Sequence, residues 1–207
     1  MSLDIFEIIK GRRSIRGYLP TAVPEDSLLR IFEAARWAPS AHNVQPWRFI
    51  VIVRADLKQR LAKAMTDEWL KDLIRDGVSV ETQEGLVRRS IEQFTGAPVL
   101  ILACISMKDM DKYPDEKRQR CEHIMATQSL TAAIQNMLLT VHSQGLGACW
   151  FCAPLFCQDV VRGLLEIPND IEPQALITLG YPSEEPEPPP KKPLKEIVFR
   201  DRWGEML

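Results

Sequence analysis

The sequence has no excess of charge of either sign, no long apolar run and few cysteines, and each shortage excludes a class of protein. A net charge of −2 over 207 residues provides no broad basic field for binding nucleic acid. The longest apolar runs, such as residues 49–53 and 99–105, are far too short to cross a bilayer. The first residues lack the basic-then-apolar layout of a secretory signal, and five cysteines are an odd number at low density. We therefore expect a cytoplasmic protein without a disulfide framework, and with neither a nucleic acid nor a membrane as partner.

The usual catalytic motifs are also missing. No G-x-S-x-G, Walker loop or G-x-G-x-x-G occurs, and His42, His123 and His142 show no metal-ligand spacing. Cys149 and Cys152 form a C-x-x-C, but positions three apart on a strand face opposite sides, so these thiols should not share a metal or a disulfide. We expect no metal site and no catalytic side chain, and a bound organic cofactor is then the economical source of reactivity.

Apolar residues make up 45% of the chain, enough for a well-buried core in one large or two small domains. Hydrophobic periodicity and breakers predict helices over residues 4–10, 25–37, 55–77, 82–94, 116–143 and 154–165, and strands over 47–53, 97–105, 148–152 and 175–179. Ser2 is the expected cap of the first helix. The helices between 55 and 94 form a charged hairpin, which is either a lid over a pocket or a solvated face. Its acidic and basic residues have the helical spacing of ordinary surface pairs.

Three segments stand out as candidates for binding. The turn Arg12-Arg13-Ser14-Ile15-Arg16 carries three guanidiniums, which favour a phosphate unless the turn is simply solvated. In the loop 38–47, Pro39 and Pro46 disfavour helix at the residues before them. Its side chains offer hydrogen-bonding groups that need not take part in backbone pairing. An ordinary polar loop would have the same composition. The tail from Pro182 is proline-rich and should be an extended arm with basic and apolar anchors beyond it.

Four segments in the right order resemble the nitroreductase family of flavoproteins. They are the basic turn 12–16, the loop Ala38-Pro39-Ser40-Ala41-His42-Asn43-Val44-Gln45-Pro46-Trp47, the segment Gly145-Leu146-Gly147-Ala148-Cys149-Trp150, and the closing Leu179-Gly180-Tyr181-Pro182 with Lys191-Lys192-Pro193-Leu194. The resemblance implies an α+β fold with a central, mostly antiparallel sheet surrounded by helices, in an intertwined homodimer that binds FMN at its interface. It implies one FMN-binding domain over residues 1–181, with a helical excursion at about 55–94, and a C-terminal arm over 182–207 that belongs to the same domain.

The resemblance also assigns the cofactor-binding residues by position. Arg12, Ser14 and Arg16 should hold the phosphate and the pyrimidine edge of the flavin, with Arg13 contributing mainly backbone. Pro39, Ser40, Ala41 and Asn43 should reach the flavin of the other subunit, and Lys191 and Lys192 should meet the phosphate. Trp150, Phe151, Cys152 and Ala153 should line the ring, with one backbone N–H directed at the flavin N5.

The implied mechanism is ping-pong. NADH or NADPH gives a hydride to the flavin N5 and leaves, and an electron-poor small molecule such as a nitroaromatic, a quinone or an enone is then reduced in the same place. The protein supplies position, a donor to N5 and positive charge, so no side chain needs to act as acid or base.

Two other functions remain open. Residues 64–77 and 113–118 resemble the flavin-reductase domain of the bifunctional enzyme of deazaflavin-coenzyme biosynthesis, which implies a reductase for a dehydro precursor of that coenzyme. Ala41-His42-Asn43 departs from the proline-histidine-histidine expected there. The same binding motifs also suit a non-catalytic flavin carrier or sensor.

Overall fold

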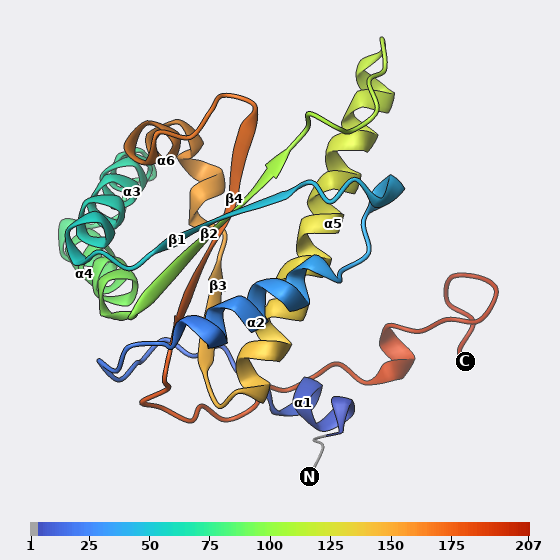
Figure 1. Ribbon diagram of the computed structural model, residues 1–207, viewed down its shortest axis with the longest axis horizontal. Coiled ribbons are helices and arrows are strands. Elements are labelled where there is room, and N and C mark those ends of the chain that lie inside the picture. Colours follow the sequence, from blue (N-terminus) through green and yellow to red (C-terminus); the bar gives the residue numbers. More distant parts are fainter. Residues whose placement is uncertain (1–3) are drawn as a thin grey trace.

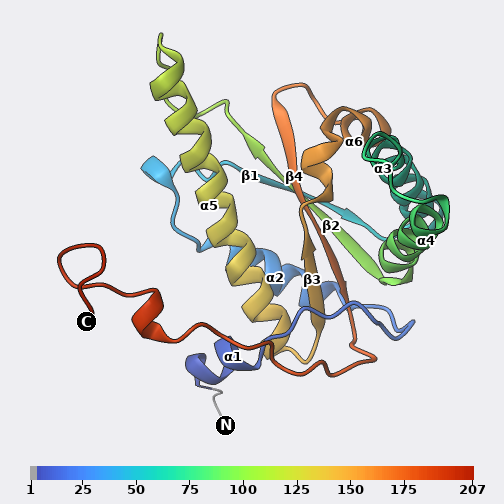
Figure 2. The same cartoon turned by 180° about the vertical axis from the view of Figure 1, so that it is seen from behind.

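A computed structural model describes residues 4–207, and a four-stranded antiparallel sheet lies at its centre (Figures 1 and 2). The strands are β1 (Trp47–Ile52), β2 (Val99–Ser106), β3 (Gly147–Phe151) and β4 (Ile171–Gly180), in the order β1-β2-β4-β3. Helices cover both faces of this sheet (Figure 1). The expected α+β fold with an antiparallel sheet surrounded by helices is therefore confirmed.

The sheet follows from the apolar run of β2. All eight of its residues are buried, as a central strand with helices on both faces requires. Alternate side chains separate into two cores: Ile101 and Ile105 face one side of the sheet, and Leu100 and Leu102 face the other. The strand predicted over 47–53 is the edge strand β1, and only its two end residues are buried.

Two helices cover the first face and three cover the second (Figure 1). On the first lie α2 (Glu25–Arg36) and α5 (Glu116–Ser143), and on the second lie α3 (Ala55–Arg75), α4 (Val80–Gly96) and α6 (Gln158–Leu165). The prediction for α5 is correct at both ends, because Asp115 caps its first turn and its inner residues are apolar. The short helix α1 (Ile5–Gly11) is capped by Asp4; the predicted cap, Ser2, lies outside the described residues.

Two predicted boundaries are wrong, both beside prolines. The helix predicted over 154–165 divides into a 3-10 turn η2 (Ala153–Phe156) and α6, because Cys157 between them has an extended φ of −148°. Strand β4 begins at Ile171, four residues before the predicted start. It accommodates Pro173 at a register shift opposite Cys104, where a strand tolerates a residue without an N–H donor.

The segment after β4 leaves the sheet and runs past α1 (Figure 2). Residues 183–193 contain no helix or strand, and a single 3-10 turn η3 (Leu194–Glu196) follows. Among residues 4–207, no helix combines the length and the apolar character that spanning a membrane requires.

Candidate functional site

The arginine-rich turn lies against the start of β3. Ser14 forms a parallel bridge with Ala148, and the N–H of Ile15 donates to the carbonyl of Ala148 at 3.0 Å. Ile15 is buried above Gly147, where a β-carbon would lie only 2.8 Å from the Ile15 side chain. The glycine is therefore needed for the close approach that fixes the turn to the strand.

The guanidiniums of this turn have no acidic partner. Arg13 donates to the carbonyls of Lys10 and Arg12 at 2.6 and 3.0 Å, and Arg16 donates to the carbonyl of Ser14 at 3.3 Å. Across residues 4–207, none of the ion pairs involves Arg12, Arg13 or Arg16. The side chain of Arg13 is therefore held by backbone carbonyls, while Arg12 and Arg16 remain available to an anion.

The carboxylate of Glu184, close to this turn, binds backbone instead. Glu184 accepts the N–H groups of Arg16 and Gly17 at 2.6 and 3.0 Å, and these bonds lower the pKa of Glu184. Burial and then the charges of Arg12 and Arg13 lower the pKa of His142. Both causes disfavour a proton on this imidazole, burial more than the two arginines.

At the other end of β3, successive side chains leave on opposite faces. Trp150 packs with the core around α5, while Phe151 packs with the core around α3 and meets Phe94 edge-on at 5.1 Å. A flat ring at the end of β3 can thus contact only one of these two side chains, and the other position contributes backbone. Cys149 is buried in β3, whereas Cys152 lies just beyond the end of the strand and is exposed, and both are free thiols.

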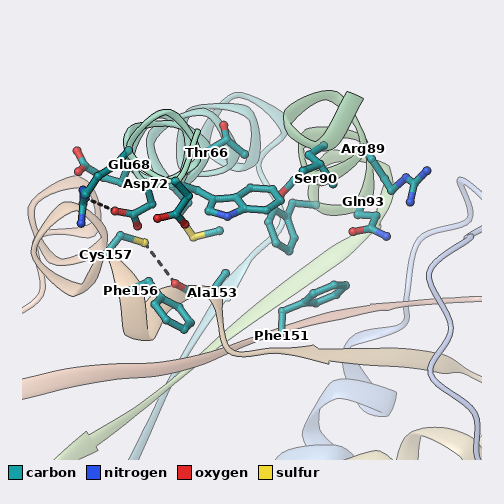
Figure 3. A pocket seen from close by; sticks show the side chains of 16 residues that line it. Thr66, Glu68, Asp72, Arg89, Ser90, Gln93, Phe151, Ala153, Phe156 and Cys157 are labelled. Atoms are coloured by element: carbon teal, nitrogen blue, oxygen red, sulfur yellow. Dashed lines mark hydrogen bonds and ion pairs between the residues drawn. The ribbon is translucent and has the colours of Figure 1, made fainter. Parts of the chain in front are cut away.

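A cavity of about 630 Å³ opens beside Phe151, between the α3–α4 hairpin and η2 (Figure 3). Its walls combine aromatic and charged side chains: Met65, Thr66, Glu68, Trp69, Asp72, Arg75, Asp76, Leu86, Arg89, Ser90, Gln93, Phe94, Phe151, Ala153, Phe156 and Cys157. Of these residues, Phe151 and Ala153 belong to the predicted flavin-binding set, and those between 64 and 77 lie in the segment that resembles the deazaflavin-coenzyme enzyme. The remaining lining residues, among them Leu86, Arg89 and Phe156, carry no motif and were not predicted.

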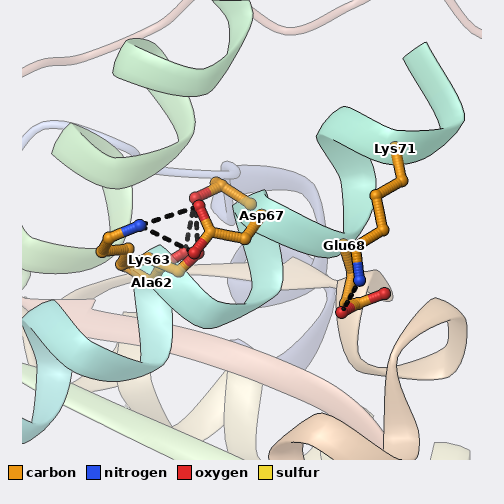
Figure 4. Close-up of polar contacts among 6 residues, drawn as sticks. Ala62, Lys63, Asp67, Glu68 and Lys71 are labelled. Atoms are coloured by element: carbon orange, nitrogen blue, oxygen red, sulfur yellow. Dashed lines mark hydrogen bonds and ion pairs between the residues drawn. The ribbon is translucent and has the colours of Figure 1, made fainter. Parts of the chain in front are cut away.

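Charged side chains of α3 form pairs three or four residues apart, and some of them, such as Glu68 and Asp72, also line the cavity. Lys63 pairs with Asp67 at 2.7 Å and Lys71 pairs with Glu68 at 2.6 Å, all on α3 (Figure 4). Arg75 likewise pairs with Asp72. The surface pairing predicted for these residues is therefore confirmed, and the same hairpin also roofs a cavity.

The loop 38–47 lies beside α5, apart from the basic turn (Figures 1 and 2). It contains the 3-10 turn η1 (Ala41–Asn43), in which His42 and Asn43 have positive φ values of 52° and 55°. The N–H of Ala41 donates to Ser129 Oγ at 3.1 Å, and the N–H of Gln45 donates to Ser40 Oγ at 3.0 Å. Left-handed backbone at non-glycine residues is costly, so these contacts hold the loop in a conformation typical of functional sites.

The structure therefore brings together only part of the predicted site within one chain. Arg12, Ser14 and Arg16 adjoin β3 and so align with Trp150 to Ala153, whereas Pro39, Ser40, Ala41 and Asn43 do not. The arm contacts the basic turn through residues 182–188, which line a second cavity of about 460 Å³ with Arg12 and Arg13. Lys191 and Lys192 are exposed beyond that cavity and form no ion pair in the part of the chain that is described.

The chain is similar to known proteins along most of its length. The model of the family described as "Nitroreductase family" matches residues 9–181. A protein of Methanothermobacter thermautotrophicus, provisionally named NADH dehydrogenase/NAD(P)H nitroreductase, is 34% identical over 188 residues, which are 89% of this chain and 80% of that protein.

Solved structures agree with this similarity. A BluB-like flavoprotein from Clostridium difficile 630 is 28% identical with a TM-score of 0.81, and the match covers 97% of this chain and 100% of that one. A provisionally named nitroreductase from Desulfovibrio desulfuricans, solved in complex with FMN, is also 28% identical, with a TM-score of 0.74 and coverage of 98% and 99%.

Proposed function

Because this chain belongs to the nitroreductase family, we propose that it is an FMN-dependent oxidoreductase that transfers a hydride from NADH or NADPH to an electron-poor small molecule. One observation carries the proposal. The bridge between Ser14 and Ala148 puts unpaired guanidiniums at one end of a strand whose other end opens onto a cavity. A charged tail and a flat ring, joined by a linker, match that layout.

The residues present fit FMN. Arg12 and Arg16 offer two guanidiniums that form no ion pair among residues 4–207, which suits a phosphate, and Ser14 lies between them in the turn. From Ala148 to Cys152 the strand advances about 13 Å, at roughly 3.3 Å per residue. That length is comparable to the reach from the phosphate to the ring of FMN. The FMN complex of the relative from Desulfovibrio desulfuricans supports the same assignment.

When bound, FMN supplies the redox chemistry, accepting a hydride from reduced nicotinamide and passing it to the acceptor in ping-pong order. The chain's own residues bind and orient. Arg12 and Arg16 would bind the phosphate, and backbone N–H groups at Cys152 and Ala153 would donate to the edge of the ring. Phe151 forms part of the adjoining cavity. The positive charge of the turn would stabilise the negative charge that reduction adds to the bound flavin. Lys191 and Lys192 would reach the phosphate once the arm is drawn toward the turn.

We propose that the complete site needs a second copy of the chain. The loop 38–47 lies apart from the basic turn (Figures 1 and 2), so its residues Pro39, Ser40, Ala41 and Asn43 would reach the flavin of the partner rather than their own. The surface supports this, because α1 buries none of its residues and large apolar side chains are exposed along α1 and the arm: Ile5, Phe6, Ile9, Leu194, Ile197 and Trp203. Light scattering should give twice the mass of one chain; a monomer that retains stoichiometric FMN would contradict the shared site.

The acceptor would bind in the cavity beneath the α3–α4 hairpin. Phe151, Phe156 and Trp69 provide apolar contact for a nitroaromatic, a quinone or an enone, and Arg89 offers a positive group to its oxygen atoms. The decisive experiment mixes the yellow holoprotein anaerobically with NADH or NADPH, follows loss of the flavin absorbance, and then adds acceptor. Reduction by either donor followed by reoxidation by a quinone supports the proposal. Reduction by neither donor excludes the nicotinamide half-reaction.

The same experiment tests a second candidate function. The segment 64–77, which resembles the flavin domain of the deazaflavin-coenzyme enzyme, supplies one wall of this cavity. That placement favours a dehydro precursor of a deazaflavin as the substrate, with reduced deazaflavin as an alternative donor. A donor comparison under single-turnover conditions separates the two functions, and steady turnover with any acceptor excludes a pure carrier or sensor.

A further inference from the structure

We propose that His42, Asp111 and Glu122 bind a divalent metal ion. They come from η1, from the loop between β2 and α5, and from the first half of α5. One ligand atom from each residue lies within 4.8 Å of the other two. Because these residues are far apart in the sequence, no ligand spacing reveals them, which explains why the sequence predicted no metal site.

Glu122 gives the strongest indication of a missing ligand. Its side chain is only 2% exposed, and its Oε2 atom is buried without a hydrogen-bond partner among the described residues. Leaving a buried carboxylate oxygen unpaired costs several times what an ordinary hydrogen bond contributes. A cation between Glu122 and the two exposed groups would satisfy that oxygen.

His42 is held in place by its backbone. Its φ of 52° lies in the left-handed region, which a non-glycine residue occupies only when the surroundings impose it. The hydrogen bond from Ala41 to Ser129 of α5 fixes the adjoining residue, and η1 lies beside the yellow-green half of α5 (Figure 1). The imidazole is thus presented toward the helix that carries Glu122.

The distances suit ligation better than direct pairing. His42 Nε2 and Asp111 Oδ2 are 3.9 Å apart, too far for a hydrogen bond. Two ligands of one ion, each at about 2.1 Å from it, lie at most about 4.2 Å apart. Since His42 and Asp111 are more than half exposed, small side-chain rotations can bring together ligand atoms that already lie within 4.8 Å of one another.

The ligand set indicates the class of ion. One imidazole and two carboxylates suit zinc, iron(II), cobalt(II) or manganese(II) better than calcium or magnesium, which favour oxygen alone. Two carboxylates also balance the charge of a divalent ion. Three protein ligands leave a coordination position for water.

The test uses the full chain, freed of any affinity tag and of metal, and titrates it with Co2+ while recording visible spectra and the thermal midpoint. We expect one equivalent to bind per chain with d–d bands typical of nitrogen and oxygen ligands. Glu122→Gln and His42→Ala should each weaken binding by at least about 100-fold. His123→Ala is the matched control, because His123 neighbours Glu122 in sequence but pairs with Glu172 at 2.8 Å.

Three results would overturn the site. They are the absence of stoichiometric binding by the parent, unchanged affinity in both variants, and an intense thiolate-to-cobalt band that assigns the ion to a cysteine. If Glu122→Gln does not fold, the exposed position of His42 keeps the test decisive. FMN content is measured in parallel, so that loss of metal binding is distinguished from loss of the flavin.

Discussion

Replacing Arg12 and Arg16 together by alanine should remove most of the affinity for FMN while leaving the fold intact. Both guanidiniums lie beside the start of β3 and neither forms an ion pair within residues 4–207. Their removal therefore breaks no ion pair in the described protein, although the bond from Arg16 to the carbonyl of Ser14 is lost. The affinity that is lost is therefore the part that the phosphate of FMN contributes.

The size of the effect follows from charge-assisted hydrogen bonding. Each such bond contributes about 1.5–3 kcal/mol. Arg16 is exposed and Arg12 is half-buried, so solvent screening favours the lower end for each. Two bonds then amount to about 3 kcal/mol, which weakens the binding constant by about 10²-fold.

The assay is a fluorescence titration of flavin-free protein with FMN and, separately, with riboflavin. Riboflavin has no phosphate, so its affinity should change little between parent and double variant, and the difference isolates the arginine–phosphate coupling. A second variant, Arg30→Ala with Arg60→Ala, makes the same change in net charge on exposed parts of α2 and α3. Equal losses for FMN and riboflavin, or an equal loss in the control, would refute the placement of the phosphate.

Three further changes test the surrounding structure. Gly147→Ala puts a β-carbon about 2.8 Å from Ile15, so denaturant melts should show a loss of about 1–3 kcal/mol together with weaker FMN binding, whereas Gly163→Ala, which meets nothing within 4 Å, should show neither. Leu102→Ala empties a fully buried position of β2, and the free energy of unfolding should fall by about 2–5 kcal/mol in urea. Backbone hydrogen bonds lower the pKa of Glu184 in the folded state, so its contribution is present above the unfolded pKa and is lost as the pH falls. Glu184→Gln should therefore be slightly less stable at pH 7, by less than about 1 kcal/mol because the group is exposed, and should match the parent in acid. An equal difference at both pH values would exclude this role.

Much of the fold was predictable because local and global preferences agree. The run of β2 is apolar along its whole length, and that is what a strand between two cores requires. The ends of α5 were equally clear, since Asp115 is a capping residue and Gly145 has the positive φ of a helix stop. Pro173 was misleading, because a proline inside a strand is tolerated only at an irregularity, and register shifts depend on the partner strand.

The functional site shows the same contrast between features that local sequence determines and features that tertiary packing determines. The turn 12–16 carries its chemistry in adjacent residues, so its composition alone raised an anion as one of two interpretations, the other being a solvated turn. The cavity lining and the cluster of His42, Asp111 and Glu122 depend on which segments pack together, and that information is tertiary. Trp150 and Phe151 show the intermediate case: their position beside the site follows from sequence, but the face each side chain occupies follows from the strand pleat.

The contact of Glu184 explains how the turn keeps its positive charge. A carboxylate this close to three arginines would ordinarily pair with one of them and neutralise the turn. Glu184 instead accepts the N–H groups of Arg16 and Gly17, which lie on the backbone of the turn itself. The carboxylate thereby attaches the start of the arm to the turn while leaving the guanidiniums to other anions. Since like charges held together without a partner repel, the flavin-free protein stores unfavourable energy that an added phosphate relieves. Binding of FMN should therefore raise the thermal midpoint by more than its contacts with the ring alone supply, and riboflavin should lack that excess.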